Sequence, residues 1–316
     1  MLFLNASDVR RALSVRECID VMSDLYEDEA ADVFAQPPRT VIRIDSSSVI
    51  LTMPAYSPKL RRFATKIVTE YKENPLRNGG PIQGGVTVLM DSSDSKVLAI
   101  LDSPEVTAIR TGAVSGLATK FLSRPDSEAV ASIGSGQQAR SMFRAVAAVR
   151  NIKKGYVYSR NPENASLFAS ELSRDLGFEI RKCSARDEAL KNADIVNLAT
   201  NSATPVVKRS EIADGAHINS VGTLPDRQEL DIQTIIDSAL FVDTKEGVLR
   251  EAGDIISAIK HGRISEKSIR GDLSQLARGI VKGREENVQI TLFKSVGFAL
   301  QDVYASSFVY TKLAKE

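Results

Sequence analysis

The sequence predicts an α/β protein in which a parallel-sheet domain follows a discontinuous α+β domain. From residue 128 onward, short apolar strands alternate with helical patterns, which is typical of βαβ units and a parallel sheet. Between residues 39 and 102, β-branched strands follow one another with few helices, which indicates an antiparallel sheet. A last helical pattern, at 290–314, is expected to pack back on the first domain and so make it discontinuous.

Length and composition set the broad class. The chain has 316 residues, which is enough for two medium-sized domains with separate cores. Its net charge of +1 favours neither nucleic acid nor a membrane surface, and 26% charged residues are usual in soluble proteins. The start lacks signal-peptide features, and Cys18 and Cys183 lack metal or redox spacing. We therefore expect a cytoplasmic protein with no metal, nucleic-acid or membrane partner.

The first domain begins with a helical pattern over 8–35, with Ser7 and Asp8 as its cap. Apolar runs then predict strands at 39–44, 48–56 and 62–71 and a hairpin over 84–102. Apolar residues at about fourfold spacing predict an amphipathic helix over 103–122. We expect Ser103 to cap this helix.

In the second domain, strands and helices alternate along the chain. Strands are predicted at 129–133, 155–159, 178–183, 194–200, 216–221 and 239–243, and helices at 137–149, 162–176 and 187–193. Gly177 is expected to end the helix 162–176. We place the first domain at residues 1–118 plus 291–316 and the second at 119–290.

A glycine-rich turn follows the strand 129–133. Its sequence is a G-x-G-x-x-A form made by Gly134, Ser135, Gly136, Gln137, Gln138 and Ala139. Such a turn lets a pyrophosphate approach the backbone at the start of a helix. Because it joins a strand to a helix within a βαβ unit, it predicts a Rossmann dinucleotide-binding domain, although a tight structural turn is the alternative.

The end of the next strand bears on the choice of cofactor. An NAD site usually places Asp or Glu there, whereas this chain has Ser159, Arg160 and Asn161. A guanidinium pairs well with a 2′-phosphate, so we favour NADP(H) over NAD(H), although Arg160 could also be a solvated loop residue. The strand-end loop with Ala199 and Thr200 is also expected at the cofactor, as are Val221 and Gly222.

Three cations of the first domain are candidates for substrate binding. Arg39 follows two prolines, Lys66 lies in an apolar strand, and Arg110 lies in the first turns of the helix 103–122. A cation beside apolar neighbours needs a partner, and a substrate carboxylate would provide one. From spacing alone, a solvated or ion-paired surface residue is the better explanation for each of them. The chain has no G-x-S-x-G or H-x-x-x-H motif, and His217 is expected to be structural.

Five stretches, in order over nearly the whole chain, resemble the ornithine cyclodeaminase/mu-crystallin family. They are TAIRTGAVSGLATKFL, IGSGQQA, LPDRQELD, EAGDI and ITLFKSVGFALQDVYAS. The resemblance implies a homodimer in which the Rossmann domain binds NAD(P) and the first domain handles substrate and dimerisation. It also implies hydride transfer between nicotinamide and the α-carbon of an amino acid or its imine, as in ornithine cyclodeamination, alanine dehydrogenation and ketimine reduction.

The resemblance also assigns roles to residues. The family's carboxylate-binding arginines match Arg39 and Arg110, and its active-site lysine matches Lys66. Arg110 and Thr111 are then expected at a helix start, near both substrate and cofactor. One position departs from the cyclodeaminase pattern of the family. The catalytic Asp of that pattern corresponds to Thr223, whose hydroxyl is a poor base at neutral pH.

The leading hypothesis is an NAD(P)-dependent reductase of small cyclic or α-imino acids, or an amino-acid dehydrogenase running in reverse. In it, Arg39 and Arg110 hold the carboxylate, Lys66 gives a proton to the imine nitrogen, and Thr223 is a polar neighbour. Two alternatives stay open. One is a true ornithine cyclodeaminase, and the other is a nucleotide-regulated binding protein with little catalysis.

Overall fold

The computed structural model describes residues 1–316 apart from 29–35, 47, 72, 75–78 and 316. Its contacts divide the chain into unit 1, Met1–Arg110 with Phe298–Glu316, and unit 2, Thr111–Gly297. The first boundary lies before the predicted end of the first segment at residue 118, and the second lies after the predicted restart at residue 291. The predicted fold class is confirmed, because unit 2 carries a parallel sheet with helices and unit 1 a mixed sheet with helices.

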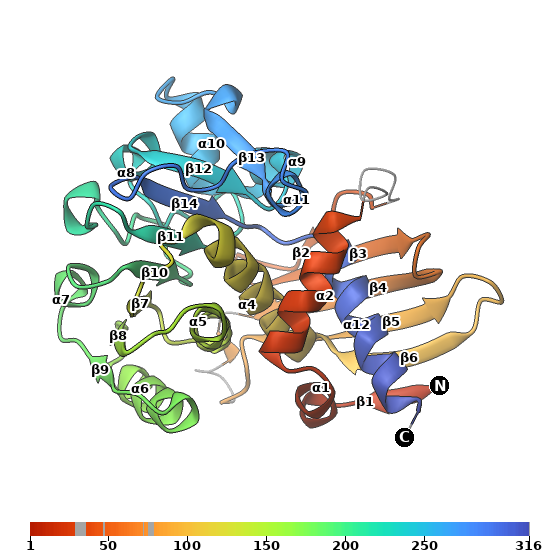
Figure 1. The fold of residues 1–316 in the computed structure, drawn as a ribbon. Helices are drawn as coiled ribbons and strands as arrows, with labels where there is room; N and C mark the ends of the chain where they lie inside the picture. Colours follow the sequence, from red (N-terminus) through yellow and green to blue (C-terminus); the bar gives the residue numbers. More distant parts are fainter. Residues whose placement is uncertain (29–35, 47, 72, 75–78, 316) are drawn as a thin grey trace. The chain divides into compact units, whose positions relative to one another are not determined.

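Unit 1 is built on a six-stranded sheet in the order β1-β6-β5-β4-β3-β2 (Figure 1). The strands are β1 (Leu2–Leu4), β2 (Thr40–Arg43), β3 (Ser48–Ser57), β4 (Arg62–Tyr71), β5 (Gln83–Asp91) and β6 (Val97–Asp102). Strands β2 to β6 pair antiparallel in succession, as predicted, whereas β1 runs parallel to β6. The sequence does not predict β1, because three residues are too few to show an alternation.

The N-terminal helical pattern forms two helices rather than one, α1 (Ala6–Ala12) and α2 (Val15–Glu27). Ser14 separates them and caps α2 with its hydroxyl. The side chain of Asn5 caps α1, so the cap expected at Ser7 and Asp8 is wrong, and both residues lie in the first turn. The part of the expected helix at 29–35 lies outside the described residues.

The C-terminal helix α12 (Ala299–Leu313) covers one face of the unit 1 sheet. It packs against β3, β4 and β5 and against α2, and Figure 1 shows both helices on this side of the strands. Because strand residues alternate between faces, Ala64, Lys66 and Val68 are buried, whereas Ile67 is exposed. The register of β4 thus turns a lysine toward the covered face.

Helix α4 (Ser103–Leu122) has the predicted limits and runs from unit 1 into unit 2. Its cap differs from the expectation, because the Asp102 carboxylate accepts the backbone N–H of Glu105 at 2.8 Å, whereas Ser103 lies inside the helix. Nearly every residue of α4 is buried, so the helix is not amphipathic as expected. Arg110 and Thr111 were expected at a helix start, but they lie in the middle of α4.

Unit 2 contains an eight-stranded parallel sheet in the order β13-β12-β14-β11-β10-β7-β8-β9. Its strands are β7 (Ala129–Ile133), β8 (Lys154–Tyr158), β9 (Ile180–Lys182), β10 (Ile195–Leu198), β11 (His217–Ser220), β12 (Ser238–Val242), β13 (Ile269–Asp272) and β14 (Ile290–Lys294). The helices are α5 (Gln137–Val149), α6 (Pro162–Leu176), α7 (Arg186–Leu190), α8 (Ile232–Ile236), α9 (Lys245–Glu251), α10 (Gly253–Lys260) and α11 (Leu273–Ala277), with 3-10 turns η2 (Arg209–Glu211) and η3 (Glu266–Ser268). Gly177, with φ 76°, ends α6 as predicted.

One predicted helix is wrong in its first part. Residues 290–294 form the strand β14 between β12 and β11, and only Ala299–Leu313 is helical. All five side chains of β14 are buried. A strand buried on both faces reads as a continuous apolar run, which periodicity does not separate from a buried helix.

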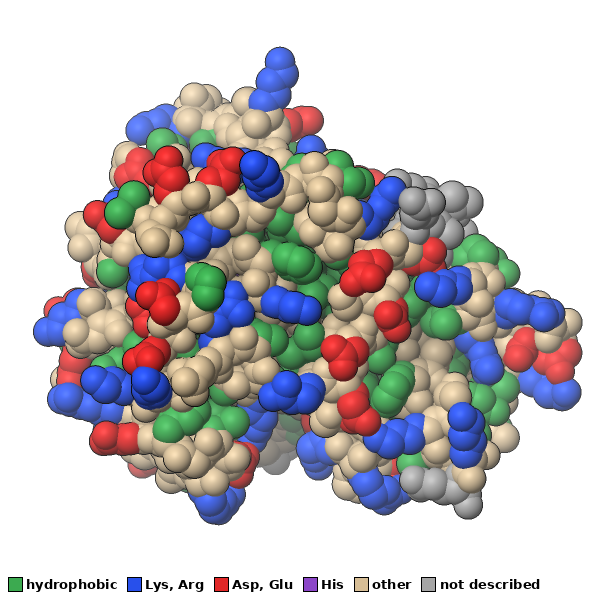
Figure 2. Space-filling view, in the orientation of Figure 1, with side chains coloured by type: hydrophobic (Ala, Val, Ile, Leu, Met, Phe, Trp, Pro, Cys, Tyr) green, Lys and Arg blue, Asp and Glu red, His purple; other side chains and the backbone are tan. Residues whose placement is uncertain are grey.

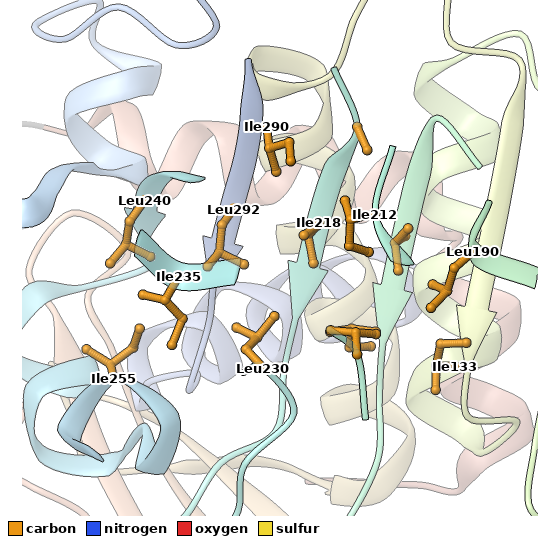
Figure 3. Close-up of a cluster of buried hydrophobic side chains, with 14 of the residues drawn as sticks. Ile133, Leu190, Ile212, Ile218, Leu230, Ile235, Leu240, Ile255, Ile290 and Leu292 are labelled. Carbon is orange, nitrogen blue, oxygen red and sulfur yellow. The ribbon is translucent and has the colours of Figure 1, made fainter. Parts of the chain in front are cut away.

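Aliphatic side chains hold the unit 2 sheet to its helices. On one face, Ile218, Leu240 and Leu292 from three strands of the sheet form a core with Ile235 of α8 and Ile255 of α10 (Figure 3). All of these side chains are buried. This packing fixes the carboxyl ends of the strands, where ligands bind in open α/β sheets.

The surface carries charges of both signs. Figure 2 shows basic and acidic side chains interspersed over the face in view, with apolar side chains scattered among them. In the described part of the chain, no helix has the length and apolar character needed to cross a membrane.

Candidate active site

A buried ion cluster lies in unit 1, between the sheet and α12. Lys66 projects from β4, and its Nζ lies 2.8 Å from the Asp302 carboxylate on α12. Arg110 reaches the same carboxylate from α4, with its Nε 3.2 Å from Oδ1. The three residues are between 1% and 5% exposed. The structure therefore brings together two of the three predicted cations, and a carboxylate joins them.

Polar side chains of α12 and α2 hold the arginine in place. An N–H of Arg110 donates to the Gln301 amide oxygen at 2.7 Å, and the Gln301 amide nitrogen donates to the Tyr26 hydroxyl at 2.7 Å. Sequence reasoning missed Asp302, Gln301 and Tyr26. The available signal was the pair Gln301–Asp302 inside an otherwise apolar helical run, since such residues are rarely buried without a partner.

The electrostatics of the cluster suit an anionic ligand. Lys66, Arg110 and Asp302 together carry one net positive charge when all are ionised. Burial, with the nearby charges of Arg110 and Arg39, lowers the pKa of Lys66 to about 8, although Asp302 works in the opposite direction. Burial also opposes ionisation of Asp302, but the charges of Lys66 and Arg110 outweigh it and hold the pKa of Asp302 below its usual value.

Arg39 lies just before β2 and is half-buried. The charge of Arg39 contributes to the lowered pKa of Lys66. The structure thus places Arg39 within electrostatic reach of Lys66.

The glycine-rich turn of unit 2 leaves its backbone accessible at the start of α5. Gly134 has φ 108°, and a Cβ there would lie 2.3 Å from the Ala199 carbonyl oxygen. A Cβ on Gly136 would meet no atom within 4 Å, which leaves open space against the backbone. Gly136 is the N-cap residue of α5, and because it has no side chain, it provides no side-chain oxygen to the first N–H groups of the helix. The residues of this turn therefore fit a pyrophosphate at the start of α5.

The residues predicted to choose between NADP(H) and NAD(H) follow β8, whose last residue is hydrogen-bonded to the glycine-rich turn. The Gly134 N–H donates to the Tyr158 carbonyl at 2.9 Å. Arg160 is exposed, and Ser159 is half-buried. The side-chain oxygen of Asn161 accepts the backbone N–H groups of Glu163 and Asn164 and caps α6, so this oxygen is already engaged.

The loops after β10 and β11 meet at a buried carboxylate that sequence reasoning missed. Glu229 accepts hydrogen bonds from Thr200, Ser220 and Gly222, which joins the predicted cofactor residues Thr200 and Gly222. Val221 and Thr223 lie beside them and are half-buried. The LPDRQELD stretch contains Glu229, but nothing in its spacing showed that the carboxylate would be buried.

His217 belongs to the interior of unit 2. It is fully buried in β11 and lies within hydrogen-bond distance of Thr291 and Asn219. Burial, with the charge of Arg284, lowers the pKa of His217 to about 3, so the ring is neutral at physiological pH. Within the described ranges, no group of three His, Cys, Asp or Glu residues could hold a metal ion.

Comparison with known proteins identifies the family. A model of the ornithine cyclodeaminase/mu-crystallin family matches residues 1–316. The chain belongs to this family. A Delta(1)-pyrroline-2-carboxylate reductase of Bacillus cereus is 33% identical over 315 residues, which are 99% of this chain and 96% of the relative. The family resemblance inferred from the sequence is therefore confirmed.

Solved structures of ornithine cyclodeaminase/mu-crystallin-type proteins share the whole fold. The Thermococcus litoralis Delta(1)-pyrroline-2-carboxylate reductase, solved with NADH and L-proline, is 42% identical with a TM-score of 0.96, covering 100% of this chain and 98% of its own. An archaeal alanine dehydrogenase dimer with bound NAD is 28% identical with a TM-score of 0.91, covering 100% of this chain and 97% of its own. The match extends through both units.

Proposed function

We propose that this protein is an NAD(P)-dependent reductase of small cyclic or α-imino acids. The observation that carries the proposal is the buried Lys66–Asp302–Arg110 cluster, which combines a net positive charge with a lysine whose pKa is about 8. Such a cluster can bind a carboxylate and also hold a transferable proton near physiological pH. The similarity to pyrroline-2-carboxylate reductases supports the same activity.

The residues of unit 1 take distinct roles in this proposal. Arg110 and Arg39 bind the substrate carboxylate, because a guanidinium pairs with it through two hydrogen bonds. Lys66 gives its Nζ proton to the imine nitrogen, and Asp302 keeps the ammonium in place. When bound, the nicotinamide cofactor supplies the hydride, and the protein positions and polarises the substrate.

A panel of imines tests the proposal. The protein is mixed with NADPH or NADH and with pyrroline-2-carboxylate, piperideine-2-carboxylate, or pyruvate plus ammonia, and the absorbance of the reduced cofactor is followed. Oxidation with at least one cyclic imine is expected. Cofactor binding without turnover of any compound, unchanged in Lys66→Ala, would instead support the nucleotide-regulated binding protein.

Ornithine cyclodeamination is the second candidate. The family membership supports it, whereas Thr223 opposes it, because no carboxylate stands at this position. Proline and ammonia formed from ornithine, without net change in reduced cofactor, would establish it. In that case the Thr223 hydroxyl is not a barrier to the reaction.

For the cofactor, we favour NADP(H) over NAD(H). Arg160 is exposed at the end of β8, and none of the three residues 159–161 is Asp or Glu. The Thermococcus litoralis relative was solved with NADH, so the two cofactors must be compared directly. Arg160→Ser is expected to raise KM for NADPH about tenfold and to leave KM for NADH unchanged. Arg174→Ser is the control, since Arg174 is exposed in α6 of the same unit.

We also propose a cytoplasmic homodimer formed through the sheet face of unit 1 that α12 leaves uncovered. Ile42, Ile67 and Val86 are 52%, 38% and 39% exposed, which is unusual for aliphatic strand residues. Ile67 and Val86 are cross-strand partners. The dimeric alanine dehydrogenase of the same fold supports a second copy as the occupant. In light scattering, Ile42→Glu should give monomers, whereas Leu167→Glu, at an exposed position of α6, should leave the dimer intact.

A further inference from the structure

The buried carboxylate of Glu229 joins two loops at the carboxyl edge of the unit 2 sheet. Its Oε1 accepts the Thr200 backbone N–H at 2.6 Å and the Thr200 hydroxyl at 3.0 Å. Its Oε2 accepts the Ser220 hydroxyl at 2.7 Å and the Gly222 N–H at 2.8 Å. Because β10 and β11 are adjacent, one side chain fixes the loops that follow both strands.

The contacts around Glu229 require a carboxylate. Four donors converge on two oxygens, which an amide could not accept without turning an N–H toward another donor. The fit is also close, because a Cβ on Gly222 would lie 2.8 Å from Cδ of Glu229. Any other residue at 222 would push the carboxylate away from its donors.

A buried lysine is connected to Glu229 through the Ser220 hydroxyl. Lys294 is fully buried, and its Nζ donates to the Ser220 hydroxyl at 2.9 Å and to Asp254 at 2.8 Å. Asp254 accepts in turn from the Glu229 backbone N–H at 3.4 Å. Lys294 and Asp254 thus form a buried ion pair, and the Ser220 hydroxyl and the Glu229 N–H connect this pair to Glu229.

The first clamped loop touches the glycine-rich turn. The Ala199 carbonyl occupies the space that a Cβ on Gly134 would take, and the Ala199 N–H donates to Ile133 at 3.1 Å. Thr200 is the next residue and is held by Glu229. A shift of this loop would therefore be transmitted to the turn.

The second clamped loop leads to Thr223. Leu224, directly after it, has φ 85°, a value that a bulky side chain rarely adopts. Leu224 also forms an isolated bridge with Ala252. Strain of this kind persists only where neighbouring contacts determine the conformation, and the clamp on Gly222 is one of these contacts.

We infer that Glu229 is a positioning residue for dinucleotide binding. Its carboxylate holds the loops after β10 and β11 in the conformation that the nucleotide site uses, without touching the cofactor itself. The inference rests on the proposed function in one respect, namely that unit 2 binds a nicotinamide dinucleotide.

The test is the near-isosteric substitution Glu229→Gln in the full-length chain. We expect Kd and KM for the preferred cofactor to rise about tenfold or more, with a smaller change in KM for the imino acid. Asp194→Asn is the matched control. Asp194 accepts the Glu128 and Ala129 N–H groups at 2.9 Å and so clamps the opposite, amino end of the sheet.

The control separates positioning from general stability. Asp194→Asn should lower the melting temperature but leave cofactor Kd within about twofold of wild type. Equal losses of stability in both variants, with an unchanged cofactor Kd for Glu229→Gln, would overturn the inference. If wild type binds neither NADPH nor NADH, the proposed function fails first.

A milder variant covers the case in which Glu229→Gln does not fold. Ser220→Ala removes one of the four donors and also the Lys294 contact. It is expected to raise cofactor Kd about threefold. A folded Ser220→Ala protein with wild-type cofactor Kd would then contradict the positioning role.

Discussion

The Lys66 ammonium and the Asp302 carboxylate lie 2.8 Å apart and are both almost completely buried. The first residue comes from the central part of the unit 1 sheet and the second from the C-terminal helix. Asp302 also holds Arg110, so this carboxylate organises both cations of the cluster.

Asp302→Asn is expected to lower the free energy of unfolding by about 3–5 kcal/mol, because it leaves two buried cations without their shared carboxylate. Urea denaturation measures the change. Lys312→Gln is the control, since Lys312 and Glu17 form a pair between α12 and α2 that is 39% exposed on each side. That variant should change stability by less than about 1 kcal/mol. Equal effects in the two variants would contradict the assigned role of Asp302.

The rate of imine reduction should depend on the protonation of Lys66. Burial lowers its pKa to about 8, so the proton-donating ammonium form is lost as the pH rises through this value, and kcat/KM in the reductive direction should fall above it. Asp302 raises the pKa of Lys66, so Asp302→Asn should move the falling limb to lower pH. A profile that is flat from pH 6 to about pH 9 would exclude Lys66 as the proton donor.

Arg110→Lys tests the recognition of the substrate carboxylate. The lysine keeps the charge but loses the planar pair of donors and the contact with Gln301, so kcat/KM should fall about 100-fold. Steady-state kinetics with the imino acid measure the change. Arg10→Lys is the control, because Arg10 is a largely exposed arginine of the same unit, paired with Glu105. A similar loss in Arg10→Lys would show that the effect is not specific to Arg110.

Gly134→Ala and Gly136→Ala should separate folding from cofactor binding. A Cβ on Gly134 would collide with the Ala199 carbonyl at a φ of 108°, so the first variant should lose about 1–3 kcal/mol of stability. A Cβ on Gly136 meets no protein atom within 4 Å, so the second should fold normally but bind NAD(P) about tenfold more weakly. Thermal melts and cofactor titrations check both, and unchanged affinity in Gly136→Ala would argue against a pyrophosphate at this turn.

Much of the fold was predictable because local patterns coincide with elements. The limits of α5 and α6 follow from the glycine-rich turn, the apolar spacing and the glycine at 177, all of which act within a few residues. Helix α4 has its predicted limits, although its cap and its burial pattern differ from the prediction. The strand β14 was missed because its residues are buried on both faces, which removes the alternation that marks a strand. The strand β1 was missed because it has only three residues.

The candidate site was predictable only in part. Lys66 and Arg110 were candidates as cations in apolar segments, and the family resemblance assigned their roles, whereas Gly134 stood out because of the turn that it permits. Their partners did not stand out. Asp302 and Glu229 are acidic residues in helical or loop segments, and a sequence does not show whether such a residue faces water or a buried cation.

The sequence by itself determined most of the secondary structure, the family and the side chains available for the chemistry, because these depend on local spacing and on the identity of each residue. Only the tertiary structure decided which charges meet. Lys66 and Asp302, or Glu229 and Thr200, come together because strands and helices distant in the chain pack against one another. Burial then strengthens each ion pair and shifts the pKa of Lys66, which no local pattern encodes.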